Sequence, residues 1–146
     1  MSKRQVFTFS GTSGAAASTT AAIGAVKNGF LGFNSFWIHA NLLGGTGGTL
    51  NLRLQRQVTT DIWSDWVSFP QLAAGAAAIS YALSVPDGGS AIAVVGGGSD
   101  ATPTVVLAAN SFVGGHPGNS LRLVGTTGSG NTVGAAQAVY LTCMRF

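Results

Sequence analysis

The chain has 146 residues, of which 46% are hydrophobic and only 8% are charged, and its formal net charge at pH 7 is +3. This length suits one domain, in which roughly two thirds of the surface of the unfolded chain can be buried. The Lys and Arg residues are scattered with no more than two together, which argues against a nucleic-acid partner. Because a monomer that stays soluble alone usually carries more charge, we predict that other protein covers much of the surface; the alternative is a sparingly soluble monomer.

The single cysteine, Cys143, excludes an intrachain disulfide and a metal site built from several cysteines. Folding in a reducing compartment is the simplest explanation for this cysteine usage. No stretch has about 18 consecutive apolar residues, so the sequence predicts no transmembrane helix and no membrane partner. The first residues, MSKRQVFTF, are basic but have no apolar stretch after them, so they do not resemble a signal peptide.

The first predicted element in chain order is an extended strand or arm over residues 3–9, after which a run of small, uncharged residues follows. Phe7 and Phe9 share one face of this element because side chains alternate along an extended chain. The Thr, Ser and Gly content of the following run favours an adaptable linker over a short helix. The sequence therefore predicts an N-terminal arm over residues 1–25 and a β-sandwich domain over residues 26–146.

The clearest pattern is a hairpin between residues 49 and 69. Leu50, Leu52 and Leu54 alternate with polar residues, which is the period of a strand with one face in the core. Arg53 lies on the polar side of this strand, which we expect to face water or a partner. A second extended run, which contains two tryptophans, returns after a polar turn and completes the hairpin.

The rest of the chain predicts further strands separated by turns rich in Gly and Pro. No segment has a convincing amphipathic helical pattern, and no exact internal repeat is visible. The other candidate strands are residues 35–43, 79–84, 91–95, 104–107, 121–123 and 137–145. Together these patterns predict an all-β fold, an antiparallel sandwich or jelly roll of about eight strands with an extended N-terminal arm.

The residues offer no convincing site for catalysis, a metal ion or a cofactor. The chain has four Asp and no Glu, and the aspartates lie in predicted turns and loops, where such side chains more often hydrogen-bond their own backbone. His39 and His116 have no second metal ligand at a useful spacing, and neither a G-x-S-x-G motif nor a phosphate loop is present. Cys143 lies inside a predicted strand and fits a buried, inert thiol. We therefore predict that the protein is not an enzyme.

Tryptophans and arginines remain as candidate binding residues. Trp37, Trp63 and Trp66 could form an aromatic platform that stacks on sugar rings, although apolar neighbours favour Trp63 or Trp66 as an anchor of the hairpin in the core. Arg53 and Arg56 lie on or near the polar side of the central strand. They are either solvated or paired with an acidic partner surface.

The hairpin resembles a pattern of small virion proteins of tailed bacteriophages. In that pattern a strand of the form L-x-L/V-x-L-Q leads through a short turn to W-S/T-D-W/L-V-S/A-F-x-Q, and here the two parts are LNLRLQ at 50–55 and WSDWVSFPQ at 63–71. HPGNSLRL at 116–123 is similar to the P-G-x-x-L-R-L strand of these proteins. GAAQAV at 134–139 then introduces the last strand.

This resemblance implies a β-sandwich or jelly-roll virion protein, first of all a head decoration (cement) protein on the outer face of the shell of major capsid protein. Such proteins often form trimers and often reach capsid subunits with an N-terminal arm. They are made in the cytoplasm of the bacterial host and end on the virion surface. The expected contacts with the shell are Lys3, Arg4, Phe7, Phe9, Arg53 and Arg56. The alternative is a tail- or fibre-associated sandwich that recognises a host-surface glycan through the three tryptophans.

Overall fold

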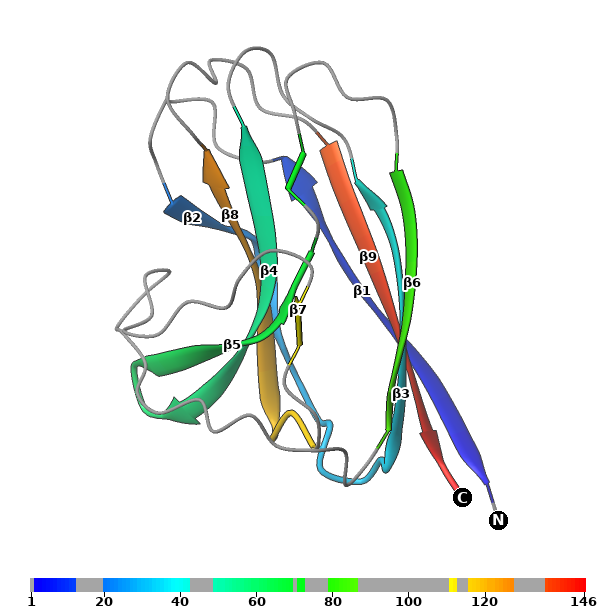
Figure 1. The fold of residues 1–146 in the computed structure, drawn as a ribbon. Coiled ribbons are helices and arrows are strands. Elements are labelled where there is room, and N and C mark those ends of the chain that lie inside the picture. Colours follow the sequence, from blue (N-terminus) through cyan, green and yellow to red (C-terminus); the bar gives the residue numbers. More distant parts are fainter. Residues whose placement is uncertain are drawn as a thin grey trace.

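The computed structural model of this chain is an all-β fold of two antiparallel sheets (Figure 1). It describes residues 2–12, 20–42, 49–69, 71–72, 79–86, 111–112, 116–127 and 136–146. Within these ranges there is no helix, and hence no helix that could cross a membrane. The strands predicted at 91–95 and 104–107 lie outside the described residues.

One sheet has four strands in the order β1-β9-β3-β6. Its strands are β1 (Lys3–Thr12), β9 (Ala136–Arg145), β3 (Ser35–Leu42) and β6 (Ile79–Pro86). β1 is an edge strand and pairs with β9 along its whole length without a register shift, from Lys3 opposite Arg145 to Thr12 opposite Ala136. The two ends of the chain therefore meet at one end of this sheet, as the N and C labels in Figure 1 show.

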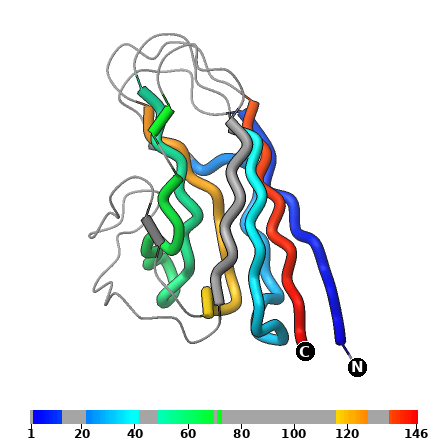
Figure 2. The backbone as a smooth tube through the Cα atoms, turned by 45° about the vertical axis from the view of Figure 1, so that its right-hand side comes forward, coloured from blue at the N-terminus to red at the C-terminus, as the bar shows by residue number. Residues whose placement is uncertain are grey.

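The other sheet has five strands in the order β2-β8-β4-β5-β7. Its strands are β2 (Thr20–Asn28), β8 (Ser120–Thr127), β4 (Leu50–Thr59), β5 (Ile62–Ser68) and β7 (Ser111–Phe112). β4 and β5 form the hairpin that the sequence predicts. Figure 2 shows the two sheets as two layers, which is the arrangement of a β-sandwich.

The hydrophobic core lies between these layers. Leu50, Leu52 and Leu54 of β4 are fully buried, as the alternation in the sequence predicts. Burying each of these leucines contributes roughly 1.5–3 kcal/mol to the free energy of folding. Trp66 of β5 meets Phe36 of β3 edge to face across the core, with ring centroids 5.7 Å apart. The prediction that a tryptophan anchors the hairpin in the core is thus confirmed for Trp66.

The N-terminal segment that the sequence assigns to an arm contributes a strand to each sheet. Phe9 of β1 and Ile23 of β2 are buried in the core, and the expected boundary after residue 25 falls inside β2. β1 and β2 approach closely where Gly24 adopts a φ of 72°, since a Cβ atom there would lie 2.5 Å from the Ser10 carbonyl oxygen. Gly24 is one of the small residues whose composition indicates a linker. Because glycine has no Cβ atom, it permits this close approach of the two backbones.

Candidate functional site

The polar side of the central hairpin is buried, which contradicts the prediction that it faces water or a partner. Arg53, Gln55 and Asp65 form a network in which Arg53 Nη1 lies 3.7 Å from Asp65 Oδ2, and Gln55 Nε2 donates to Asp65 Oδ1 at 2.9 Å. Arg122 Nε of β8 donates to Gln55 Oε1 at 2.9 Å. Arg53 also donates to the hydroxyl of Thr126. These contacts join β4, β5 and β8 on the side of the sheet away from the core.

Trp63 belongs to the same buried network. The guanidinium of Arg122 lies over its ring, 4.4 Å from the ring centroid, and the side chain is only 7% exposed. Burying charges costs several kcal/mol, and this cost is offset only when the partners are well placed. Arg53 and Trp63 therefore serve the sheet itself, and the structure removes both from the set of exposed binding residues.

The three tryptophans do not form one platform. Trp63 and Trp66 are three positions apart on β5 and point to opposite faces, Trp63 beneath Arg122 and Trp66 into the core. Trp37 lies on β3 of the other sheet and is 52% exposed. The predicted platform is therefore wrong, because the strand period and the two-layer fold separate its members, and Trp37 alone remains open to a ligand.

The predicted contact residues of the N-terminal segment divide into buried and exposed members. Phe9 lies in the core, and Phe7 is partly buried and packs against the core. Lys3 and Arg4 are exposed, and the Lys3 ammonium lies 5.5 Å from the centroid of the Phe33 ring. The two phenylalanines therefore hold the edge strand in place, while the two cations remain accessible.

A basic surface forms where the two ends of the chain meet, and we call Lys3, Arg4 and Arg145 the basic end. Arg145 is the pairing partner of Lys3 in the β1–β9 register, and all three side chains are exposed. In the described part of the chain, the aspartates are Asp61 in the β4–β5 turn and Asp65 in the buried network. The sequence did not reveal Arg145 as a site residue, because only long-range strand pairing brings it beside Lys3.

Two exposed apolar side chains accompany the basic end. Leu31 is 70% exposed and Phe146 is 79% exposed. Asn34 ties the loop that carries Leu31 to this end, since its backbone N–H donates to the Met144 carbonyl oxygen at 3.0 Å and its Oδ1 accepts from the Phe146 N–H at 3.3 Å. This end of the sandwich thus combines positive charge with apolar surface.

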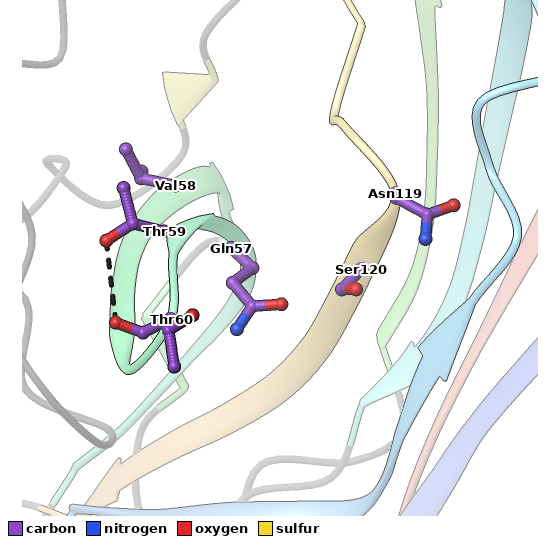
Figure 3. Close-up of a pocket in the computed structure, with 6 residues that line it drawn as sticks. All are labelled: Gln57, Val58, Thr59, Thr60, Asn119 and Ser120. Atoms are coloured by element: carbon purple, nitrogen blue, oxygen red, sulfur yellow. Dashed lines mark hydrogen bonds between the residues drawn. The ribbon is translucent and has the colours of Figure 1, made fainter.

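A small polar cleft opens between the tip of the β4–β5 hairpin and the start of β8 (Figure 3). Its volume is about 190 Å³, and none of the side chains that line it is charged. The lining residues are Gln57, Val58, Thr59, Thr60, Asn119 and Ser120. The cleft offers neutral hydrogen-bonding groups but no paired acid and base.

A second cleft of about 250 Å³ contains two ionisable side chains, Arg56 and His116. His116 Nδ1 accepts a hydrogen bond from the Gly118 N–H at 2.9 Å, and Nε2 lies 3.0 Å from the Phe30 carbonyl oxygen. Both ring nitrogens thus fix the turn before β8, with the proton on Nε2. Arg56 is half-buried, its pKa is lowered by this burial, and its Nε lies 3.5 Å from Ser64 Oγ. Of the predicted arginine contacts, Arg56 is only partly accessible.

The side chains of the described ranges provide no cluster of three or more His, Cys, Asp or Glu residues that could hold a metal ion. Cys143 is fully buried on the core side of β9, as predicted, and burial raises the pKa of its thiol to about 12. A thiol with this pKa stays protonated at neutral pH and is a poor nucleophile.

No protein-family model matches this chain, and no match was found among curated proteins or solved structures. The candidate binding features therefore come from the structure. They are the basic end and the exposed Trp37 on the four-stranded sheet.

Proposed function

We propose that the protein is a structural virion protein, a head decoration (cement) protein that binds the outer surface of the major capsid shell of a tailed bacteriophage. The virion assignment rests on the resemblance of the hairpin and of the strand after Pro117 to small virion proteins. The observation that carries the docking surface is the meeting of Lys3, Arg4 and Arg145 at one exposed end of the β1–β9 pair. An acidic patch on the shell would complement this end.

We further propose that the sandwich is a jelly roll, and the strand pairing supports this. The pairs are nested, β1 with β9, β2 with β8, β3 with β6 and β4 with β5, and the two-residue β7 stands outside the nested set. A long antiparallel hairpin folded over two sheets in this way gives the eight strands and two Greek keys of a jelly roll. Domains of viral capsids are among the proteins that use this fold.

The mechanism would be bridging between shell subunits. An exposed ion pair contributes only about 0.2–1 kcal/mol, so three cations alone bind weakly. A stable protein interface buries about 800 Å² on each partner, and apolar neighbours such as Leu31 and Phe146 would extend the contact. Assembly into a homo-oligomer, which we propose to be a trimer, would multiply these contacts through a raised effective concentration.

Co-sedimentation with empty, undecorated capsids tests this function. We expect saturable binding at a fixed ratio to the shell protein, which weakens as salt screens the exposed charges. Deletion of residues 1–25 is an unsuitable test because it would remove β1 and the core side chain of Phe9. Charge reversal is better, and the variant that combines Lys3→Glu with Arg145→Glu should lose most of the binding.

The matched control is Lys27→Glu, which reverses a cation on β2 of the other sheet. We expect this control to bind like the unaltered protein. Equal binding by the doubly reversed variant would exclude the basic end as the docking surface. Absence of any binding by the unaltered protein would exclude the decoration function.

A further inference from the structure

On β1, β9 and β3, the described side chains that point away from the core are exposed or half-exposed, and we call this side the outer face. Alternate residues of β1, β9 and β3 lie on it in register, so that Val6 lies opposite Thr142, and Thr142 opposite Trp37. Val6 is 49% exposed and Trp37 is 52% exposed. Two of the larger apolar side chains in the described part of the chain are thus open to solvent on the same face of the sheet.

Three aromatic rings lie together on this face. His39 and Tyr140 are paired across β3 and β9, and their rings are stacked, with centroids 6.3 Å apart and planes 22° apart. Trp37 is two positions before His39 on β3, so it lies on the same face about 7 Å along the strand. A row of rings therefore crosses two neighbouring strands.

Neutral hydrogen-bonding groups surround the rings. Thr8 of β1 lies opposite Tyr140, and Ser10 lies two residues further along the same strand, opposite Ala138. Asn41 of β3 continues the row of Trp37 and His39, and it is exposed, as are Thr8 and Ser10. Among the described side chains of this face, Arg4 is the only one with a permanent charge, and it lies at the corner where the chain ends meet.

We propose that the outer face binds a neutral polysaccharide, with Trp37 and Tyr140 stacking on sugar rings. The C–H face of a pyranose is apolar and packs on an aromatic ring, while its hydroxyl groups need neutral donors and acceptors such as Thr8 and Asn41. The lack of charge around the rings favours a neutral ligand over an anionic one. This binding goes beyond attachment to a shell and does not depend on it.

The size of the face decides between a glycan and a protein occupant. The three strands with described side chains, about 4.8 Å apart, and four outward positions about 7 Å apart give a patch of roughly 10 by 20 Å. This is less than half of the roughly 800 Å² that each partner buries in a standard protein interface. A second copy of this chain would therefore need further surface, whereas a segment of a few sugar units would cover the aromatic row.

Native gel electrophoresis through neutral polysaccharides tests the proposal, with dextran, laminarin, mannan and galactan as probes and alginate as an anionic contrast. We expect at least one neutral polysaccharide to retard the protein. Trp37→Ala and Tyr140→Ala should each weaken this retention by roughly tenfold, the size of a lost aromatic stack. The matched control is Leu31→Ala, which removes an exposed apolar side chain elsewhere and should leave retention unchanged.

Tryptophan fluorescence supplies a second readout. Because Trp63 and Trp66 are buried, acrylamide should quench mainly Trp37, and the retained polysaccharide should protect it. Trp37→Phe keeps an aromatic ring, so it should retain part of the binding but lose the protected signal. No retardation by any neutral polysaccharide, or retardation by alginate alone, would overturn the proposal. Protection of Trp37 by self-association at high protein concentration would overturn it in favour of a second copy.

Discussion

Each sheet has one side that faces away from the core, and these two sides differ in their residues and in their environment. On the five-stranded sheet, the side away from the core bears Arg53 and Asp65, and both are buried. On the four-stranded sheet, the corresponding side bears Trp37 and Tyr140, and both are exposed. Arg53 and Asp65 are thus buried while Trp37 and Tyr140 are exposed, the reverse of what hydropathy alone would assign to these four residues. Strand alternation tells which residues share a side, but only the tertiary fold decides which side is covered.

The largest effect should come from breaking the buried network. Asp65→Ala removes the ion-pair partner of Arg53 and the carboxylate oxygen that accepts from Gln55, and removal of one partner from a buried ion pair costs about 3–5 kcal/mol. Urea denaturation should show this loss in the free energy of unfolding. Asp65→Asn, which keeps an acceptor oxygen, should lose less.

Asp61→Asn is the control for this network, because Asp61 is exposed in the β4–β5 turn and Asn also tolerates its φ of 64°. We expect a change within about 0.5 kcal/mol at this surface position. If Asp65→Ala costs no more than the control, the network is solvated, and the contrast between the two sides disappears.

The second-largest effect should come from the contact between β1 of one sheet and β2 of the other, at Gly24 and Ser10. Gly24→Ala places a Cβ against the Ser10 carbonyl oxygen at a positive φ, and the left-handed conformation alone costs about 1–2 kcal/mol. We expect at least this loss in urea denaturation. Gly32→Ala is the control, since a Cβ at Gly32 meets nothing within 4 Å. Equal stability of the two variants would show that β1 does not lie against β2.

Local patterns predicted the hairpin, β3 and the last strand, because the alternation of Leu50, Leu52 and Leu54 and of the residues around Trp37 depends only on neighbours along the chain. The pairing of strands that are far apart along the chain could not be predicted from these local patterns. The pairing of Lys3 with Arg145, and therefore the basic end, depends on which strands become neighbours. The small residues after Phe9 carry no periodic signal, so the sequence predicts an arm, although Lys3–Thr12 and Thr20–Asn28 pair as the strands β1 and β2.

The third effect is a pH dependence of stability that comes from the two different sides of a single strand, β9. Cys143 faces the core with a thiol pKa raised to about 12 by burial, whereas Tyr140 faces outward. The thiol keeps its proton in the folded state at a pH where the unfolded chain has already lost it. Its contribution to stability is therefore complete below the unfolded pKa of about 9 and is lost as the pH rises toward 12.

The free energy of unfolding should thus fall between pH 9 and 12, and Cys143→Ala should flatten this fall. A thiol reagent at pH 7 should label the folded protein far more slowly than the protein in urea. Labelling at the same rate in both states would place Cys143 at the surface and remove the inside-outside contrast along β9.

The smallest effect on stability should come from the outer face of the four-stranded sheet, whose exposed side chains contribute little to the packing of the fold. Trp37→Ala should change the free energy of unfolding by no more than about 0.5 kcal/mol, the range of surface substitutions, since more than half of the side chain is already exposed. A loss of several kcal/mol, as at Asp65, would mean that Trp37 is part of the packing of the sheet. A near-neutral result would mean that this tryptophan is kept on the outer face at little structural benefit, as expected for a residue that contacts a ligand.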